Sequence, residues 1–355
     1  MISRRTEQPF TVALVVPTGI GAEIGGYAGD ALPVARGIAS VCDRIITHPN
    51  VMNGAQLYWP IENALYVEGY GLDQYAAGNW GLRPVRSNRV GLVLDQGIEP
   101  DLRLRHLQVA DAARATLGLQ LTDAILTDAP LNVTLKTAAS GATWGTIENP
   151  DSLLRAVERS INELGADAIA VVARFPDDIE AEALQSYRQG QGVDPLAGAE
   201  AVISHLVVRT FQIPCAHAPA LEPLPVDPQV SPRSAAEELG YTFLSSVLVG
   251  LSRAPQFVQQ RGAADLWAEG LDAIVVPETA CGGSAILSLS QKPTRIIAVN
   301  NPTALQVTPD ELGIEVTKVR SYLEAMGVLA AQRAGLDISA LTPALGKVAC
   351  LTSNN

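Results

Sequence analysis

Short apolar runs recur along the chain, each followed by a turn and then by a stretch with helical periodicity. Most of these runs are apolar at consecutive positions and do not alternate with polar residues. That pattern predicts strands buried on both faces, as in parallel sheets covered by helices. We therefore expect strands at residues 11–16, 44–47, 89–94, 131–135, 168–173, 271–276 and 295–299.

Residue types that begin and end helices lie between these runs. Asn149-Pro150-Asp151 combines a capping residue, a proline for the first turn and an early acid, and Gly165 stands where that helix should end. Comparable patterns predict helices near 30–42, 101–116, 150–164, 195–208, 232–239, 283–291 and 316–335. Residues 214–232 are rich in proline and are expected to form a loop.

The alternation of strands and helices predicts an α/β fold with a mainly parallel sheet and helices on both faces. We expect one α/β unit over 11–335, with tails over 1–10 and 336–355. Alternatively the unit has two lobes, with a boundary near 175–230. The aromatic residues gathered in 50–88 suggest an insertion near a pocket.

Composition narrows the classes of protein. The 355 residues carry 25 Lys+Arg against 37 Asp+Glu, a formal net charge of -12, and no basic cluster suggests a nucleic-acid partner. The four cysteines are far apart and form no C-x-x-C pair, which favours a reducing compartment. No apolar stretch predicts a signal peptide or a membrane span. We expect a soluble cytoplasmic protein without a membrane partner, and a homo-oligomer remains open.

Ligands of open parallel sheets bind beyond the carboxyl ends of the strands, so the loops there are candidate sites. In the first such loop, Gly19 and Gly21 could present backbone amides to an anion or could simply form a tight turn. A second loop brings together Lys136, Ser140, Gly141 and Thr143. Its hydroxyl, amide and ammonium groups suit a phosphate or a carboxylate, although no Walker pattern is present.

A third loop reads PETACGGS and contains Glu278, Cys281, Gly282, Gly283 and Ser284. Amides at the start of the following helix could bind an anion, and the helix end would lower the pKa of the Cys281 thiol. A nucleophilic cysteine also needs a base nearby, and His48, His205 and His217 are the candidates. The alternatives are an anion-binding turn and an ordinary turn with a small apolar cysteine.

A fourth candidate lies in the segment PCAHAP. Cys215 and His217, together with the distant His48, could bind zinc or a similar metal. The alternative is a loop whose histidine bonds to the backbone. Arg174 ends a predicted strand, and its guanidinium would suit an anionic ligand.

Several long stretches resemble an uncharacterised family of cyanobacterial type, the domain of unknown function 3326. They include VPTGIGAEIGGYAGDA, SGATWGTIENPDSLL, SPRSAAEELGYTFL and VVPETACGGSAIL. The resemblance covers residues 11 to 335 and implies one common fold. It implies no activity.

A second, local likeness concerns residues 17–24, PTGIGAEI, which are similar to the P-A-G-I-G-P-E-I opening of 4-hydroxythreonine-4-phosphate dehydrogenase. That family binds a phosphorylated substrate, NAD and a divalent metal on a two-lobed α/β fold. This chain departs from the motif at Thr18 and Ala22, and its histidines do not match those that bind the metal in that family.

These observations favour an enzyme that acts on a small anionic metabolite, phosphorylated or carboxylated, where the loops converge. Lys136 and Arg174 would neutralise the ligand charge, and Glu278, Cys281, His217 or His48 would carry the chemistry. A non-catalytic metabolite sensor or assembly factor could use the same pocket. A third possibility is an oligomeric structural protein in which the glycine loops are only turns. Substrate and cofactor remain open.

Overall fold

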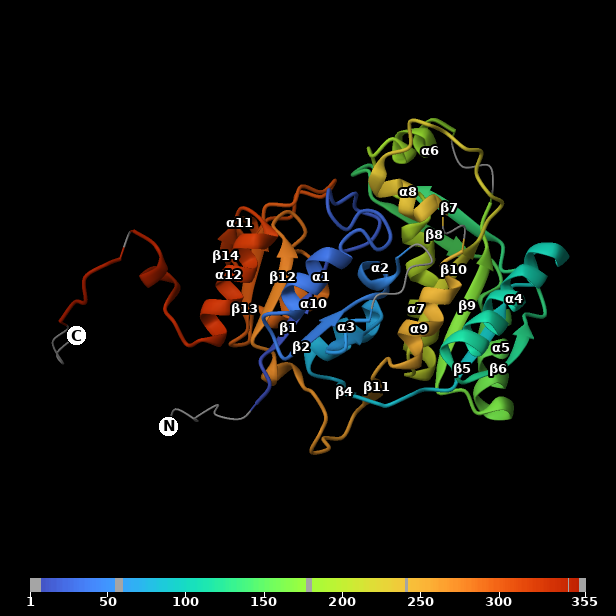
Figure 1. Ribbon diagram of the computed structural model, residues 1–355, viewed down its shortest axis with the longest axis horizontal. Helices are drawn as coiled ribbons and strands as arrows, with labels where there is room; N and C mark the ends of the chain where they lie inside the picture. The colour runs from blue at the N-terminus through green and yellow to red at the C-terminus, as the bar shows by residue number, and fades with distance from the viewer. Residues whose placement is uncertain (1–7, 55–59, 177–180, 240–241, 344, 351–355) are drawn as a thin grey trace.

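The computed structural model describes residues 8–54, 60–176, 181–239, 242–343 and 345–350. It confirms the α/β fold: two parallel sheets lie side by side, each between layers of helices (Figure 1).

The first sheet has six strands, and every neighbouring pair is parallel. Its strands in spatial order are β14 (Thr317–Val319), β13 (Arg295–Val299), β12 (Ala273–Pro277), β1 (Thr11–Leu14), β2 (Arg44–Thr47) and β3 (Ala64–Tyr66). The central strands are apolar on both faces because helices cover both. Val12 and Leu14 face α1 (Leu32–Ala39) and α12 (Tyr322–Arg333), whereas Ala13 faces α3 (Gly69–Ala77) and α10 (Ser284–Leu289).

The second sheet has four parallel strands in the order β10 (Cys215–Ala220), β9 (Ala168–Arg174), β5 (Val90–Leu94) and β6 (Leu121–Leu126). One face packs against α4 (Pro100–Leu117) and α9 (Leu244–Ser252). The other packs against α5 (Pro150–Leu164) and α7 (Ala197–Phe211).

Smaller elements complete the chain. β7 (Val133–Thr137) and β8 (Thr143–Ile147) form a hairpin, and β4 (Gly81–Arg83) pairs with β11 (Gln256–Val258). The remaining helices are α2 (Pro49–Met52), α6 (Ala181–Arg188), α8 (Pro232–Leu239), α11 (Pro309–Leu312) and the 3₁₀ turns Ala268–Gly270 and Ile338–Leu341.

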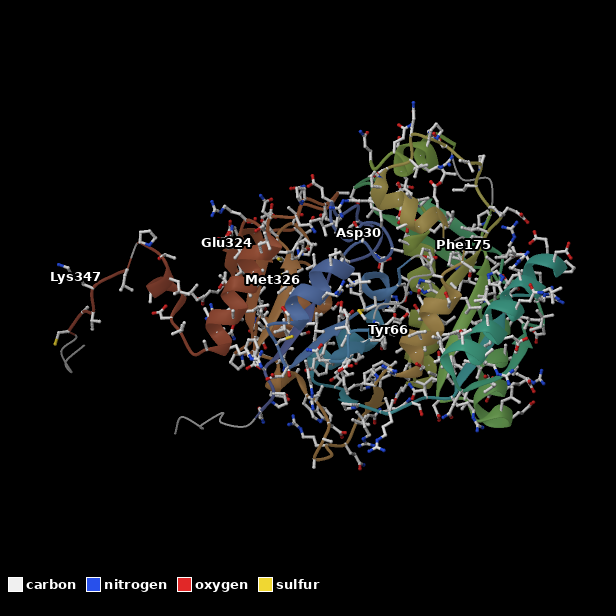
Figure 2. The ribbon with its side chains drawn as sticks, viewed as in Figure 1. Asp30, Tyr66, Phe175, Glu324, Met326 and Lys347 are labelled. Atoms are coloured by element: carbon white, nitrogen blue, oxygen red, sulfur yellow. The ribbon has the colours of Figure 1, made fainter. Side chains whose placement is uncertain are left out.

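The strands of the first sheet come from the N-terminal and C-terminal parts of the chain, and those of the second sheet come from the middle. The chain passes to the second sheet between β3 and β5 and returns between β10 and β12. Tyr66, at the end of the edge strand β3, packs into the core of the second sheet between the two halves (Figure 2). Its hydroxyl donates to Asn53 Oδ1 at 3.1 Å. A residue of the first sheet therefore belongs to the core of the second.

Three predicted elements differ from the structure. The apolar run at 131–135 predicts a buried strand, but β7 belongs to the hairpin and is largely outside the core. Residues 215–220 form β10 instead of the expected loop. The proline in that strand, Pro219, is tolerated because β10 is the edge strand and one side of it makes no ladder hydrogen bonds. Within 316–335, β14 precedes α12, so the helix begins at Tyr322.

Among the described residues, no helix combines the length and apolar character needed to cross a bilayer.

Candidate functional site

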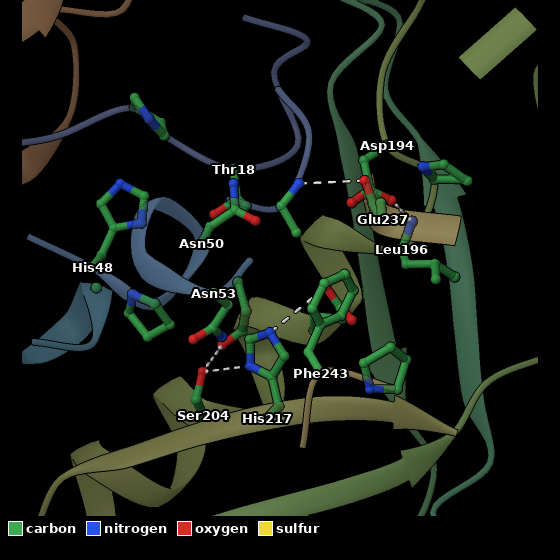
Figure 3. A pocket seen from close by; sticks show the side chains of 18 of the residues that line it. Thr18, His48, Asn50, Asn53, Asp194, Leu196, Ser204, His217, Glu237 and Phe243 are labelled. Atoms are coloured by element: carbon green, nitrogen blue, oxygen red, sulfur yellow. Dashed lines mark hydrogen bonds and ion pairs between the residues drawn. The ribbon is translucent and has the colours of Figure 1, made fainter. Parts of the chain in front are cut away.

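A cavity of about 580 Å³ lies where the carboxyl ends of the two sheets meet, and we call it the central cavity (Figure 3). The first sheet contributes Thr18 after β1 and His48 after β2, and the second contributes His217 and Pro219 on β10. Helices α3, α6, α7 and α8 supply further walls. This is the location where α/β sheets bind ligands.

Helix α7 and strand β10 bring the central polar groups together. Along β10, Ala216, Ala218 and Ala220 pack into one core of the second sheet, so His217 points to the opposite face, where α7 lies. On α7, Glu200 and Ser204 are four residues apart and therefore share one face of the helix. That face meets His217.

A polar side chain lies near each ring nitrogen of His217. Ser204 Oγ lies 3.1 Å from Nδ1, as Figure 3 shows, and Glu200 Oε2 lies 3.6 Å from Nε2. Ser204 Oγ also donates to the Ala201 carbonyl at 3.4 Å. With that donation Ser204 accepts from Nδ1–H, and the lone pair of the imidazole lies on Nε2. A separation of 3.6 Å is too long for a direct hydrogen bond, so Nε2 and Glu200 leave room for a ligand atom between them.

A second histidine, His205, pairs with Glu68 at the start of α3. His205 Nε2 lies 3.1 Å from Glu68 Oε1, and both residues line the cavity. Glu68 is also the cap of α3, because its Oε2 accepts from the backbone N–H groups of Tyr70 and Gly71 at 2.8 and 3.2 Å. Burial raises the pKa of Glu68 to about 8. Burial also lowers the pKa of His205 to about 4, and the nearby His217 adds to that shift.

Two more buried carboxyl groups lie on the far wall, where Figure 3 shows Asp194 and Glu237. Burial raises the pKa of Asp194 well above its ordinary range, and the carboxyls of Glu237 and Glu200 raise it further. Burial raises the pKa of Glu237 to about 7. Glu237 accepts from the Tyr187 hydroxyl at 2.6 Å, and Tyr187 stacks on Tyr27 with ring centroids 4.6 Å apart.

The ionisable residues of the cavity lining are mostly acidic. Its described acidic residues are Glu68, Asp73, Asp194, Glu200, Glu222, Glu237 and Glu238. Arg188 is the single arginine or lysine among these lining residues, and its guanidinium binds Glu238 Oε1 at 2.8 Å and the Pro225 carbonyl at 2.6 Å. A strongly anionic ligand would thus find little compensating charge here.

Four predicted site residues line the central cavity: His48, His217, Gly283 and Ser284. The others lie outside its lining: Gly19, Gly21, Lys136, Ser140, Gly141, Thr143, Arg174, Cys215, Glu278, Cys281 and Gly282. His48 is engaged in structure, because its Nε2 accepts from Val16 N at 3.1 Å. Burial lowers the pKa of His48 to about 4.

Cys281 does not have the environment of a nucleophile. Its side chain is fully buried, and its thiol points to the Pro277 carbonyl at 3.8 Å. Burial raises the pKa of this thiol to about 11, and the neighbouring Glu278 adds to the rise. The expected lowering of this pKa is therefore wrong. Glu278 itself pairs with Lys318 at 3.0 Å.

The first predicted loop contacts the second predicted loop and the loop after β13 directly. Thr143 N donates to the Gly19 carbonyl at 2.9 Å, and Ala304 N donates to the Ile20 carbonyl at 2.7 Å. Gly19 has φ +71°, and a Cβ there would lie 2.8 Å from Thr143 Oγ1. The glycine is thus required for the close contact between loops.

The predicted cations are engaged elsewhere. Lys136 lies over the Trp144 ring, 4.5 Å from its centroid, on the β7–β8 hairpin. Arg174 binds Glu99 with Nε–Oε2 at 2.9 Å. Cys215 is buried within the second sheet, and burial raises its pKa well above the usual range. Across the part of the chain that the structure describes, no group of three or more His, Cys, Asp and Glu residues could hold a metal ion.

Sequence reasoning considered His205 only as a candidate base for Cys281, and it missed Glu200, Ser204, Glu68, Asp194 and Glu237. A signal was present for Glu200 and Ser204, because they are polar residues within the otherwise apolar stretch AGAEAVISHLVV of a predicted helix. Polar residues at such positions suggest a helix face that meets a cavity.

Comparison with known proteins gives the family but no activity. The profile of a family described as "Protein of unknown function (DUF3326)" matches residues 11–342. A protein of Synechococcus sp. (strain ATCC 27144 / PCC 6301 / SAUG 1402/1) named "Uncharacterized lipoprotein" is 62% identical over 337 residues, which cover 94% of each chain. No solved structure matches this chain.

Proposed function

Because the chain belongs to the DUF3326 family of unknown function, we propose a function from its own cavity: it is an enzyme that transfers protons on a small, uncharged or cationic metabolite. The observation that carries this proposal is the placement of His217 Nε2 and Glu200 Oε2, 3.6 Å apart and both facing the central cavity.

His217 would act as the general base. Histidine is the commonest group in this role, and its efficiency depends on a fixed orientation towards the reacting proton. Ser204 holds Nδ1, which leaves Nε2 for the ligand. Once Nε2 has taken a proton, the Glu200 carboxylate would stabilise the resulting imidazolium. Their side chains are 19% and 13% exposed, so water screens this attraction only weakly.

The charge of the cavity bears on the ligand. Carboxyl groups outnumber cationic groups in its described lining, and the one described arginine there is already paired. A phosphate or carboxylate buried there would lose its hydration without gaining a cationic partner to compensate its charge. We therefore move the proposal from an anionic metabolite to an uncharged or cationic one.

Activity-based metabolite profiling in D₂O tests this proposal. Purified protein is incubated with a mixture of metabolites, and mass spectrometry records compounds that gain deuterium or change mass. We expect one or a few compounds to change, and we expect His217→Gln to slow that change by about 10²- to 10⁴-fold, the usual contribution of a general base. Full activity in His217→Gln would contradict the proposal.

A matched control separates chemistry from folding. His106 is another buried histidine. It lies on α4, which packs against the second sheet, and it is outside the cavity lining. His106→Gln should keep the turnover of the folded fraction. If a compound is retained by the wild-type protein but is never converted, the non-catalytic sensor becomes the better interpretation.

A further inference from the structure

The His205–Glu68 pair has no part in the base role assigned to His217. It lines the same cavity from another direction, because Glu68 begins α3 and His205 follows Ser204 on α7. The pair is therefore a second group that can exchange protons with the same ligand.

The carboxyl of Glu68 is held in place from both sides. Its Oε2 accepts two backbone N–H groups of α3, so Oε1 is directed towards His205 Nε2 at 3.1 Å. The intervening Gly69 permits this approach, since a Cβ there would lie 3.0 Å from Nε2. The Tyr70 ring packs edge-on against the imidazole, with centroids 6.3 Å apart.

The other nitrogen of His205, Nδ1, makes no hydrogen bond to any residue that the structure describes. The His205 side chain is 41% exposed, whereas that of Glu68 is only 4% exposed. A buried carboxyl that orients one nitrogen and leaves the other free is the arrangement of a histidine positioned for proton transfer.

The protonation of the pair follows from burial. Glu68 keeps its proton at neutral pH because burial raises its pKa to about 8. Its O–H then donates to His205 Nε2, which leaves the imidazole proton on Nδ1. The titratable groups that act on the pair are Asp73 on α3, and His217 and Cys215 on β10.

We infer that His205 is the general acid that works opposite His217, with Glu68 as its positioning residue, and that the substrate is a carbonyl compound that the protein isomerises. This inference rests on the proposed function and names its substrate class.

The proton transfers balance without a further reactant. His217 Nε2 removes a proton from the carbon next to the carbonyl, and the C–H electron pair becomes a C=C bond. The carbonyl π pair moves to oxygen, which takes the proton of His205 Nδ1, and Glu68 passes its own proton to Nε2. Return of a proton to a different carbon, or to the other face of the same carbon, yields the isomer, and reverse transfers restore both histidines.

The test combines a substrate-independent measurement with kinetics. First, ¹⁵N NMR of histidine side chains in the full chain reports the proton positions on His205 at pH 7. We expect the proton on Nδ1. A proton on Nε2 with a bare Nδ1 would overturn the inference whatever the substrate, and would leave the role of His217 intact.

Second, variants are compared on the compounds that the wild-type protein converts. We expect His205→Gln to lower turnover by about 10²- to 10⁴-fold, and Arg209→Gln, an exposed position on the same helix, to leave it unchanged. Loss of turnover in His217→Gln but not in His205→Gln would overturn the inference while the proposed function stands. Absence of any conversion by the wild-type protein would overturn both.

Glu68→Gln provides a readout that a purely structural role would not affect. The glutamine keeps an acceptor for the α3 cap and a donor for His205 Nε2, so the fold should be retained. We expect wild-type activity to fall near pH 8, where Glu68 loses its proton. Glutamine cannot release a proton, so this fall should be absent from the pH profile of the variant. A wild-type and a variant profile of the same shape would contradict the role of Glu68.

Discussion

At the scale of single residues, buried carboxyl groups with raised pKa values are the main ionisable feature of the central cavity. Glu68 and Glu237 both keep their protons to higher pH than usual, because burial disfavours the charged form. A protonated carboxyl can donate a hydrogen bond, which suits an uncharged ligand. The same groups make the stability of the protein depend on pH.

We predict that the free energy of unfolding falls as the pH rises from 6.5 to 8. Folding raises the pKa values of Glu68 and Glu237. Their contribution to stability is therefore complete below the pKa of the unfolded state, and it is lost as the pH rises through about 7 for Glu237 and about 8 for Glu68. His48 and His205 have lowered pKa values near 4, so their opposite dependence is confined to lower pH. The expected slope is on the order of 1 kcal/mol per pH unit.

Denaturant unfolding at several pH values in this range measures the slope. Glu68→Gln should flatten it, whereas Glu158→Gln, at an exposed position of α5, should leave it unchanged. A stability that is constant or rises over this range would contradict the burial of protonated carboxyls.

Individual site residues were only partly predictable. His217 and His48 stand out in the sequence because histidines are few and both lie next to prolines or turns. Glu200 and Ser204 are visible as polar residues in an apolar helix, but their pairing with His217 is not, since they become its neighbours only when α7 packs on β10. The nucleophilic role considered for Cys281 does not fit its environment, because the side chain is fully buried and sequence alone does not reveal burial.

At the scale of elements, glycine allows helix α9 to approach the junction of the two sheets. Gly250 lies in the interior of α9, and a Cβ there would come within 2.5 Å of the Tyr66 ring. The absence of a side chain therefore determines how closely the helix packs.

We predict that Gly250→Ala destabilises the protein by about 1–3 kcal/mol, the usual cost of overpacking a core. Intrinsic helix propensity alone would favour alanine by about 1 kcal/mol. Gly327, in the interior of α12, has open space around its Cβ position, and Gly327→Ala should be stabilising. Denaturant unfolding of both variants tests the contrast, and a stable Gly250→Ala would show that α9 can shift.

Most buried strands were predictable because a short, continuous apolar run between two turns is typical of a strand covered on both faces. β9 and β13 match their predicted ranges closely, since both are central strands with helices on each face. β10 was not predictable from its pattern, because CAHAPA lacks β-branched residues and contains a proline. Its strand conformation depends on pairing with β9.

At the scale of the whole molecule, the loop after β1 is tied to helix α8 across the cavity. Asp30 Oδ2 binds Arg233 Nη1 at 2.9 Å, and Tyr27 stacks on Tyr187 nearby. These contacts join a loop of the first sheet to helices that follow strands of the second. They stabilise the wall of the cavity that contains Glu237.

We predict that Arg233→Gln loosens this wall without unfolding the protein. Arg233 is 46% exposed, so water screens the pair, and we expect a change of about 1 kcal/mol or less in global stability. Hydrogen exchange should become faster in residues 232–239 and remain unchanged in α5. Arg159→Gln, which removes a surface pair within α5, is the matched control. Equal protection of 232–239 in the variant and the wild type would contradict the prediction.

The first sheet contains strands from both the N-terminal and the C-terminal part of the chain, and this affects the order in which the two sheets fold during synthesis. All strands of the second sheet precede β12 in the sequence, so a ribosome releases that sheet complete before the first sheet can close. Until β12 emerges, β1 lacks its neighbour and one edge of the nascent sheet stays open. The lining of the central cavity therefore stays incomplete until the loop after β12 and the start of α10 have been synthesised.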